Sequence, residues 1–319
     1  MKWIKKILNI KSDSLPENFE VILERGNVDE IKQVFKTCKY DAKGGYFEGV
    51  ALSFRLLPDE VARWLVEKGA NVNARNKDGE TPLHSRAAMI DYDLSCLLDL
   101  GADVNLISNN KKYALHGAAQ VHHAINTKLL IKNGANVNVR DLYGSSPFEL
   151  SLDCCRAYNI VNMAKISHQF IGAGLVVNDR IKQKIIDIGT DFEFNRADMK
   201  DEWVDASSDS LNQLYQLFDV IPVARQIKHD GVSLIETKQT HWRSQFQELW
   251  KQLIPASGPA QTVQGELMRI ADKVYYEINE NGACNWDDEF KKMLLSYTDI
   301  IESGIALQTS EIEKAKSII

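Results

Sequence analysis

Apolar residues recur at helical spacing along most of this chain, in two different arrangements. In the N-terminal part they form short groups such as Leu97-Leu98 and Leu129-Leu130, which predict the apolar stripes of short helices. From about residue 229 they form longer stripes, which predict longer helices. No apolar run approaches the roughly 20 residues needed to cross a bilayer, so we expect no membrane span.

The C-terminal stripes predict three helices that bury one another as a small bundle. The first helix has on one face Trp242, Phe246, Leu249, Trp250 and Leu253. The second starts near Thr262, ends at Asn281-Gly282 and has on one face Val263, Leu267, Ile270, Val274 and Ile278. The third starts near Trp286, and Asp287, Asp288 and Glu289 are favourably placed at its positive N-terminal end. Its stripe is Phe290, Leu294, Tyr297 and Ile301. Residues 305–319 are expected to form a further short helix or a frayed tail.

The N-terminal helices belong to an internal repeat. The five-residue segment Gly69-Ala-Asn-Val-Asn73 returns as Gly101-Ala-Asp-Val-Asn105 and Gly134-Ala-Asn-Val-Asn138, with a looser copy at Gly174-Leu-Val-Val-Asn178. A second motif precedes these copies in phase: Thr81-Pro-Leu-His84, Tyr113-Ala-Leu-His116 and Ser146-Pro-Phe-Glu149. Units of this size cannot bury an apolar face alone, so they must stack on one another.

The two motifs resemble the ankyrin repeat family, whose unit has a Thr-Pro-Leu-His helix start, a second helix ending in Leu-Leu, and a Gly-Ala-x-Val-Asn turn. The resemblance covers roughly residues 14–180. Elementary rules agree with it: Thr81 and Ser146 suit an N-cap, and Pro82 and Pro147 suit the first helical turn. The repeated glycines suit a left-handed helix end.

We therefore predict an all-α fold, an ankyrin-repeat solenoid followed by a small C-terminal helical bundle. Residues 1–13 are expected to be an extension or cap, and residues 14–180 to hold about five repeats of which the first and last are degenerate. Residues 181–228 are expected to be a helical capping segment, and residues 229–319 the C-terminal domain. That domain resembles a helical domain of unknown role in bacterial proteins, through Leu253-Ile-Pro-Ala-Ser-Gly258, Gln264-Gly-Glu266 and Asn285-Trp-Asp287.

Three positions depart from the repeat pattern. Arg86 stands where a small alanine is usual, so it must point outward or find a partner. Lys111 holds the turn position that Gly79 and Gly144 occupy, which predicts a strained or remodelled turn. The fifth repeat carries about seven extra residues near 153–158. Each departure is open to two interpretations, drift or adjustment to a partner.

The resemblance implies protein binding through the turn tips and the inner helices of the concave face. The tip residues are then Arg75, Asn76, Lys77, Asp78, Glu80, Ser108, Asn109, Lys111, Lys112, Arg140, Asp141, Leu142 and Tyr143. The inner helices add Ser85, Met89, Gly117 and Gln120. Tyr143 with Arg140 is the expected energetic anchor, because aromatic and arginine residues dominate interfaces.

Candidates for chemistry are few. The family uses histidines such as His84 and His116 to join neighbouring units, and His122-His123 lack nearby ligand partners, so we expect no metal site and no cofactor. Cys154-Cys155 lack the spacing of a redox or zinc pair. One helix face, with Gln264, Glu266, Arg269 and Lys273, is a possible C-terminal interface. Alternatively, the same face with Glu277 is an active site that His229, Asp230 and His241 could join. Gly265 predicts close approach of another helix or of a partner there.

Charge and cysteine content limit the partner and the compartment. The net charge of −6 divides into +2 over residues 1–180 (23 basic, 21 acidic) and −8 over residues 181–319 (15 basic, 23 acidic). The acidic C-terminal part argues against nucleic acid and is compatible with a basic protein.

Five cysteines, an odd number, form no disulfide framework. The first ten residues lack a signal peptide's cleavage site, which favours the cytoplasm, although a short amphipathic helix there could touch a membrane.

The sequence thus predicts a non-catalytic scaffold that binds and masks a protein partner, with an immunity or antitoxin-type protein of a bacterial toxin system as the concrete version. The alternative is an enzyme or effector whose C-terminal helices act on a partner recruited by the repeats.

Overall fold

The computed structural model describes residues 11–90, 92–196, 199–225, 229, 235–255, 260, 262–280 and 287–303. The predictions for residues 1–10, Asp230, Asn281-Gly282, Cys284, Trp286 and 305–319 therefore lie outside the described residues. The chain divides into two compact units, Met1–Gly189 with Asp205–Pro222, and Thr190–Val204 with Val223–Ile319.

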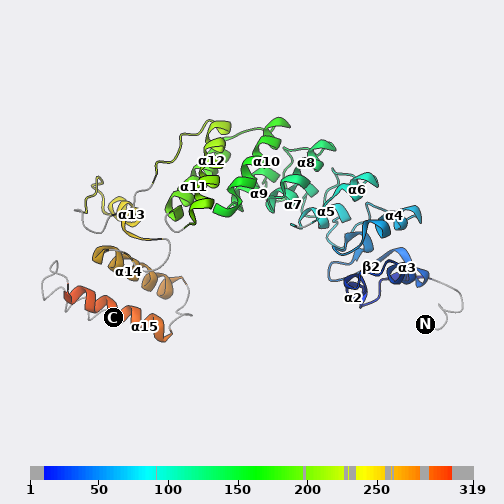
Figure 1. Ribbon diagram of the computed structural model, residues 1–319, viewed down its shortest axis with the longest axis horizontal. Coiled ribbons are helices and arrows are strands. Elements are labelled where there is room, and N and C mark those ends of the chain that lie inside the picture. The colour runs from blue at the N-terminus through cyan, green and yellow to red at the C-terminus, as the bar shows by residue number, and fades with distance from the viewer. Residues whose placement is uncertain are drawn as a thin grey trace. The chain divides into compact units, whose positions relative to one another are not determined.

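The first unit is a row of short helix pairs that lie side by side (Figure 1). Helices of neighbouring pairs contact each other, α5 with α7, α7 with α9, and α8 with α10. The pairs run α2 (Phe19–Glu24) and α3 (Val28–Thr37), η1 (Ala51–Ser53) and α4 (Asp59–Glu67), α5 (Pro82–Ala87) and α6 (Ser95–Asp99), α7 (Ala114–Gln120) and α8 (Ala124–Lys132), α9 (Pro147–Asp153) and α10 (Ile160–Gly172). Two longer helices follow, α11 (Asp179–Asn195) and α12 (Asp201–Phe218).

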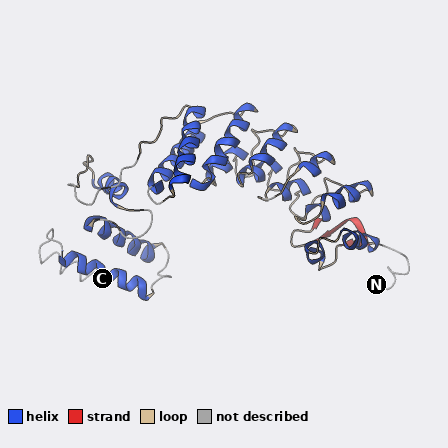
Figure 2. Ribbon diagram, in the orientation of Figure 1, coloured by secondary structure: helices blue, strands red, loops and turns tan. Residues whose placement is uncertain are grey.

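A small sheet near the N-terminus was not anticipated from the sequence. Strand β1 (Ser12–Ser14) pairs in parallel with β2 (Cys38–Gly44), and β2 pairs antiparallel with β3 (Gly49–Val50). Figure 2 shows these strands beside the first helices. In β2 the buried Cys38 and Ala42 and the half-buried Tyr40 alternate with exposed residues, which is the period-two pattern of a strand with one covered face.

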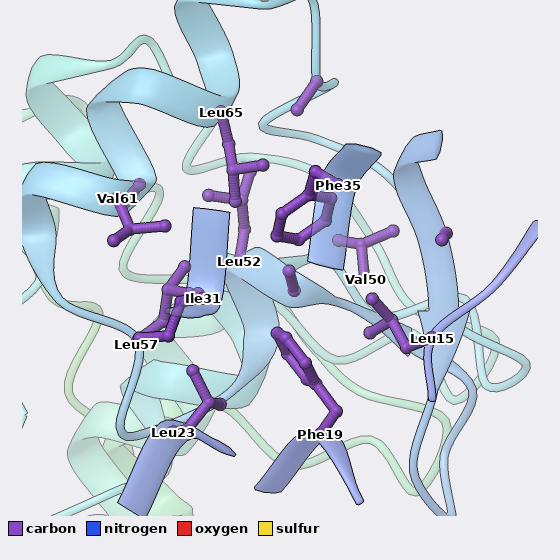
Figure 3. Close-up of a cluster of buried hydrophobic side chains, with 14 of the residues drawn as sticks. Leu15, Phe19, Leu23, Ile31, Phe35, Val50, Leu52, Leu57, Val61 and Leu65 are labelled. Atoms are coloured by element: carbon purple, nitrogen blue, oxygen red, sulfur yellow. The ribbon is translucent and has the colours of Figure 1, made fainter. Parts of the chain in front are cut away.

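The sheet and the first two helix pairs share one apolar cluster, so the first repeat is anchored by more than its own helices. Phe19 and Phe35 meet edge to face at the centre of this cluster, with ring centroids 6.2 Å apart. Strand residue Val50 and helix residues Ile31 and Leu65 pack around them (Figure 3). At about 25 cal/mol per Å² of buried apolar surface, such a cluster is the main stabilising contribution at this end of the stack.

The predicted helix starts are confirmed. Thr81 and Ser146 are the N-caps of α5 and α9, each with proline in the first turn behind it. Ser146 Oγ accepts from the Glu149 amide at 3.2 Å, and Glu149 Oε2 accepts in return from the Ser146 amide at 2.8 Å. This reciprocal capping satisfies two backbone donors that the helix itself leaves unpaired.

The first and the last residue of the repeated Gly-Ala-x-Val-Asn motif each have a structural role. The glycines adopt the left-handed conformation after each second helix, as predicted, with φ of 86° at Gly101 and at Gly134. The last asparagine reaches the next repeat: Asn105 Oδ1 accepts from the Asn136 amide at 3.3 Å, and its Nδ2 donates to the Gly134 carbonyl at 3.0 Å. Asn138 repeats the pattern on Gly174. The motif therefore both ends a helix and joins two neighbouring repeats.

Arg86, the larger residue at an alanine position, points inward and is fully buried. Its Nη1 donates to the Tyr92 hydroxyl and its Nη2 donates to the Phe54 carbonyl at 3.3 Å. The guanidinium also lies 4.2 Å from the centre of the Tyr92 ring. Space for it exists because the neighbouring repeat has only the three-residue turn η1 where α5 and α7 have full helical turns. Arg86 thus fills the volume that a shortened helix leaves.

The extra residues of the fifth repeat form a loop between α9 and α10 with the 3-10 turn η2 (Ala157–Asn159). Within it Cys155 is buried, and burial raises the pKa of its thiol to about 12, so this cysteine is a poor nucleophile. Asp153, the last residue of α9, faces α11, where it pairs with Lys184 at 2.5 Å and with Arg180 at 3.6 Å. The insertion therefore packs against the first unit's own chain.

The second unit contains α13 (Trp242–Leu253), α14 (Val263–Asn279) and α15 (Asp288–Ser303). Helix α14 contacts both others. Their starts agree with the sequence: the Thr262 hydroxyl caps α14 on the Gly265 amide at 3.0 Å, and Asp287 accepts from the Phe290 amide at 2.8 Å. The predicted stripes are correct only in part. Leu253 and Ile270 are buried, but Phe246 and Val263 are exposed.

The predicted fold class is confirmed. The described residues form a helical repeat solenoid and a helical C-terminal region, to which the structure adds the small N-terminal sheet. In the part of the chain that is described, no helix is long and apolar enough to cross a membrane.

Candidate partner-binding surface

Four tight turns lie in register along the first unit. In each, the amide of the fourth residue donates to the carbonyl of the first, and the fourth residue has positive φ. We call these turns the turn tips: residues 45–48, 76–79, 108–111 and 141–144. Neighbouring tips are joined by backbone hydrogen bonds from Lys77 to Phe47 at 3.3 Å, from Asn109 to Asp78 at 2.9 Å and from Leu142 to Asn110 at 2.9 Å. The tips therefore form one continuous, ordered edge.

The predicted tip residues divide into two groups. Asn76, Ser108 and Asp141 are buried, and their side chains accept from backbone amides within the turn or directly after it. They hold the turns and offer little surface. The others are exposed or half-buried and can reach a partner: Arg75, Lys77, Asp78, Glu80, Asn109, Lys111, Lys112, Arg140, Leu142 and Tyr143.

Tyr143 is the most open of the predicted anchors, with 81% of its surface exposed, and Leu142 beside it is 54% exposed. Arg140 is not a free cation: its Nη1 donates to the Gly144 carbonyl at 2.5 Å and to Glu149 Oε2 at 2.9 Å. The arginine instead stiffens the turn that presents Tyr143. A rigid exposed aromatic side chain loses little conformational entropy on binding.

The predicted inner-helix residues Ser85, Met89, Gly117 and Gln120 are all half-buried. Gly117 has a packing role, since a Cβ there would lie 3.2 Å from the Ala88 amide nitrogen. It lets α7 approach α5 closely. Ser85 and Met89 line a cavity described below.

Tyr46 and Phe47 are tip residues that the sequence reasoning missed. Their turn corresponds to the other three, so Phe47 occupies the position of Tyr143. Tyr46 is 82% exposed and Phe47 is 55% exposed. Lys77 of the next tip lies 4.2 Å from the centre of the Tyr46 ring and donates to the Tyr46 carbonyl at 2.8 Å. Spacing alone could have found this tip, because it lies 31 residues before the tip at 76–79.

Lys111 adopts φ of 54°, so the expected strain is present. We predict that Lys111→Gly raises the free energy of unfolding by about 1 kcal/mol, because glycine has no Cβ to crowd the left-handed conformation. Urea denaturation followed by circular dichroism measures this. Gly144→Ala is the matched reverse change: its Cβ would meet no atom within 4 Å, so it should cost a similar amount through strain alone. Equal stability of Lys111→Gly and the parent chain would contradict the prediction.

The framework histidines join repeats as expected. His84 Nε2 lies 3.0 Å from the Lys112 carbonyl, and His116 Nε2 lies 3.3 Å from the Ser145 carbonyl. His122 is also buried and reaches the Ser151 carbonyl at 2.8 Å. Burial lowers the pKa of all three, to about 4 for His116. Among the described residues, no group of three His, Cys, Asp or Glu side chains is placed to hold a metal ion.

The C-terminal candidates on α14 divide into a paired and an exposed group. Glu266 and Arg269 make a largely buried ion pair, with Nε–Oε2 of 2.8 Å and Nη2–Oε1 of 2.5 Å, while Gln264 and Lys273 are exposed. The hydrogen bond from Arg269 lowers the pKa of Glu266. The close approach predicted at Gly265 is confirmed, since a Cβ there would lie 2.9 Å from the Leu253 carbonyl oxygen. Glu266 also accepts from the Ala260 amide at 2.8 Å, so it fastens the chain between α13 and α14.

The helix pairs are stacked, and both the turns and side chains from each repeat join it to the next repeat. This architecture defines a solenoid repeat protein. The model of the ankyrin repeat family matches residues 51–141 in three copies. Residues 51–141 are therefore ankyrin repeats, and such repeats indicate a scaffold for protein–protein interaction.

Named relatives share these repeats. Human rabankyrin-5 is 29% identical over 108 residues, which are 30% of this chain and 9% of the relative. Human neurogenic locus notch homolog protein 2 is 40% identical over 72 residues, 22% of this chain and 3% of the relative. Alpha-latroinsectotoxin-Lt1a of Latrodectus tredecimguttatus is 34% identical over 293 residues, 81% of this chain and 21% of the relative. The chain thus spans less than a quarter of the length of each of these proteins.

Proposed function

We propose that this chain binds a protein partner along its turn tips and inner helices and masks a surface of that partner. The observation that carries the proposal is the continuous edge of hydrogen-bonded tips, with exposed aromatic rings at 46–47 and at 143. Between these rings the tips carry Lys77, Asp78 and Asn109, which are mixed in charge. An interface of this kind has aromatic anchors within a polar surround.

The concrete version is an immunity or antitoxin-type protein acting in a bacterial cytoplasm on a basic toxin. It is motivated by the binding scaffold and by the net charge of −8 over residues 181–319. The domain boundaries of this proposal are those of the sequence: an N-terminal cap, repeats over 14–180, a capping segment over 181–228 and an acidic domain over 229–319.

Tyr143→Ser should weaken capture of the partner roughly 30-fold, the size expected for loss of an interface hot spot of about 2 kcal/mol. The experiment purifies the tagged full-length chain from its native cells, identifies a stoichiometric protein by mass spectrometry, and measures its affinity for the purified variants. Tyr158→Ser is the matched control, because Tyr158 is 70% exposed but lies in η2, away from the tips.

Absence of a stoichiometric partner, or equal loss with Tyr143→Ser and Tyr158→Ser, would overturn the proposal. The immunity version has its own test: the captured partner should arrest growth when expressed alone and not when expressed with this chain. A harmless partner would remove that version and leave the binding function standing.

The competing function is an enzyme or effector whose C-terminal helices act on a recruited partner. Its best acid–base candidate, Glu266, has both carboxylate oxygens engaged by Arg269 and a depressed pKa, which suits a structural ion pair better than a general base. An activity that is lost in Glu266→Gln with α13–α15 still folded would favour this alternative.

A further inference from the structure

A cavity of about 490 Å³ lies at the N-terminal end of the tip row. Its walls come from α2, from the 45–48 tip and the segment after η1, and from α5. Its apolar lining side chains are Leu23, Phe47, Phe54, Leu56, Ala88 and Met89. We call it the N-terminal groove.

The groove exists because the second repeat lacks a full first helix. Where α5 and α7 complete their turns, the chain has only η1 and then continues without helix through Phe54, Arg55 and Leu56, all of which line the groove. Two contacts hold this irregular segment in place: Arg86 donates to the Phe54 carbonyl, and the Phe54 ring packs edge to face on Phe19 at 5.2 Å. The groove is therefore a fixed feature of the fold, open beside the inner helices.

The charge around the groove is predominantly acidic. Three carboxylates line it, Glu20, Glu24 and Glu80, against one guanidinium, Arg55. Tyr46 and His84 also line the groove, and burial lowers the pKa of His84, so its imidazole is neutral near pH 7. Glu20 and Glu24 are exposed on consecutive turns of α2 and face solvent at the cavity wall. An apolar pocket with a carboxylate rim is complementary to an apolar side chain with lysine or arginine beside it.

We propose that the N-terminal groove binds a short basic segment of the partner protein, with one large apolar side chain inserted among Phe54, Leu56 and Met89. Flanking lysine or arginine side chains pair with Glu20, Glu24 and Glu80. This inference rests on the proposed protein-binding function and adds the chemistry of the segment that is recognised. Tyr46 and Phe47, which line the groove and lie against Lys77, supply a ring surface for the same segment.

The probe is a phage-displayed library of random dodecapeptides, selected on the immobilised full-length chain. Enriched peptides should contain a leucine, methionine or aromatic residue within two positions of lysine or arginine. Synthetic copies should bind with affinity that falls as sodium chloride rises from 50 to 300 mM, because partly exposed charge pairs are screened by salt. Enrichment of acidic or charge-free peptides, or no enrichment, would overturn the proposal.

Variants assign the recovered peptides to the groove. The double variant Glu20→Gln/Glu24→Gln should weaken peptide binding at least tenfold, and Leu56→Ser should do the same through the apolar part. Glu17→Gln and Ile90→Ser are the matched controls, since both residues are exposed, close in sequence to groove residues and absent from its lining. Thermal melts of all four variants verify that each is folded.

The outcomes separate this inference from the function it rests on. If the groove variants do not change the affinity for the peptides, the groove proposal is wrong. A loss of affinity for the native partner in Tyr143→Ser would still support binding along the tips. Peptide binding that is sensitive to the groove variants, together with no native partner, would support the groove and overturn the proposed function.

Discussion

Arg86→Ala should lower the free energy of unfolding by about 4 kcal/mol, in the range measured when a large buried side chain is truncated or a buried charged group loses its partners. The side chain is fully buried, so its removal leaves a cavity between α5 and η1. It also leaves the Phe54 carbonyl and the Tyr92 hydroxyl without a strong donor. Urea denaturation at pH 7.5, followed by circular dichroism, measures the loss.

Arg86→Met is the matched control for volume. Methionine fills most of the space without a charge, and burial of the charge is unfavourable, as the lowered pKa of Arg86 indicates. We therefore expect Arg86→Met to cost less than about 1.5 kcal/mol. Equal losses in the two variants would show that hydrogen bonding and not volume sets the stability here. A change below 1 kcal/mol in Arg86→Ala would contradict the inward placement.

Arg86 also shows where reasoning from sequence ends. The repeat motif shows that Arg86 is larger than the usual alanine at this position. It predicts only that the side chain either has a partner or points outward. Its partners depend on the first helix of the preceding repeat. There Val50-Ala-Leu-Ser53 matches the Ala-Leu of Tyr113-Ala-Leu-His116, but the helix is shortened to the three residues of η1. At Gly101 and Pro82 a single residue determines the local backbone conformation, and there the sequence was sufficient to predict where a helix ends or begins.

The N-terminal sheet and the first turn tip were missed for related reasons. Strand β2 does carry a period-two pattern at Cys38, Tyr40 and Ala42, but it is short, and its parallel partner β1 has only three residues. Such pairing depends on contacts distant in sequence, which periodicity does not report. The tip at 45–48 lacks the asparagine, serine or aspartate that opens the other three, because Gly45 takes that position.

In the C-terminal helices the sequence predicted where helices lie better than which faces they bury. The spacing of Val263, Ile270 and Phe246 is helical, and all three lie in helices. Only Ile270 is buried, while Gly265 and Glu277 occupy covered positions that a hydrophobic stripe does not select. Helical periodicity gives a face but not its orientation when a helix contacts neighbours on two sides.

The second large effect concerns acid. Stability should fall as pH drops below about 6.5, because His84, His116 and His122 are neutral in the fold and each must accept a proton on unfolding. At His116, Nδ1 accepts from the Tyr113 amide at 3.1 Å, so Nε2 carries the hydrogen that faces the Ser145 carbonyl. A second proton has no acceptor at Nδ1 and would break the helix cap. His84 Nδ1 likewise accepts from the Thr81 amide and its Nε2 faces the Lys112 carbonyl, but the Thr81 hydroxyl also lies 2.8 Å from Nδ1.

The sign and the pH window follow from the direction of these shifts. Because the folded-state pKa values lie below the unfolded value, the stabilisation is fully present above pH 6.5 and is lost as pH falls toward the folded-state values. A decrease in the pKa of His116 from 6.5 to about 4 corresponds to roughly 3 kcal/mol. Most of that is lost by pH 4.5. The lowered pKa of Glu149 adds a loss in the same direction at lower pH still.

His116→Gln isolates this contribution, since glutamine at the third helical position can still accept from the Tyr113 amide, as Glu149 does from Ser146 in α9. The variant should be less stable than the parent chain at pH 7.5, because the link to Ser145 is weakened. Its further loss between pH 7.5 and 4.5, measured by urea denaturation at each pH, should be smaller by about 2 kcal/mol. His168→Gln, at an exposed position on α10, controls for removal of an imidazole. Parallel pH profiles for His116→Gln and the parent chain would mean that the joint between repeats does not hold His116 neutral, and the acid sensitivity would then have to arise elsewhere.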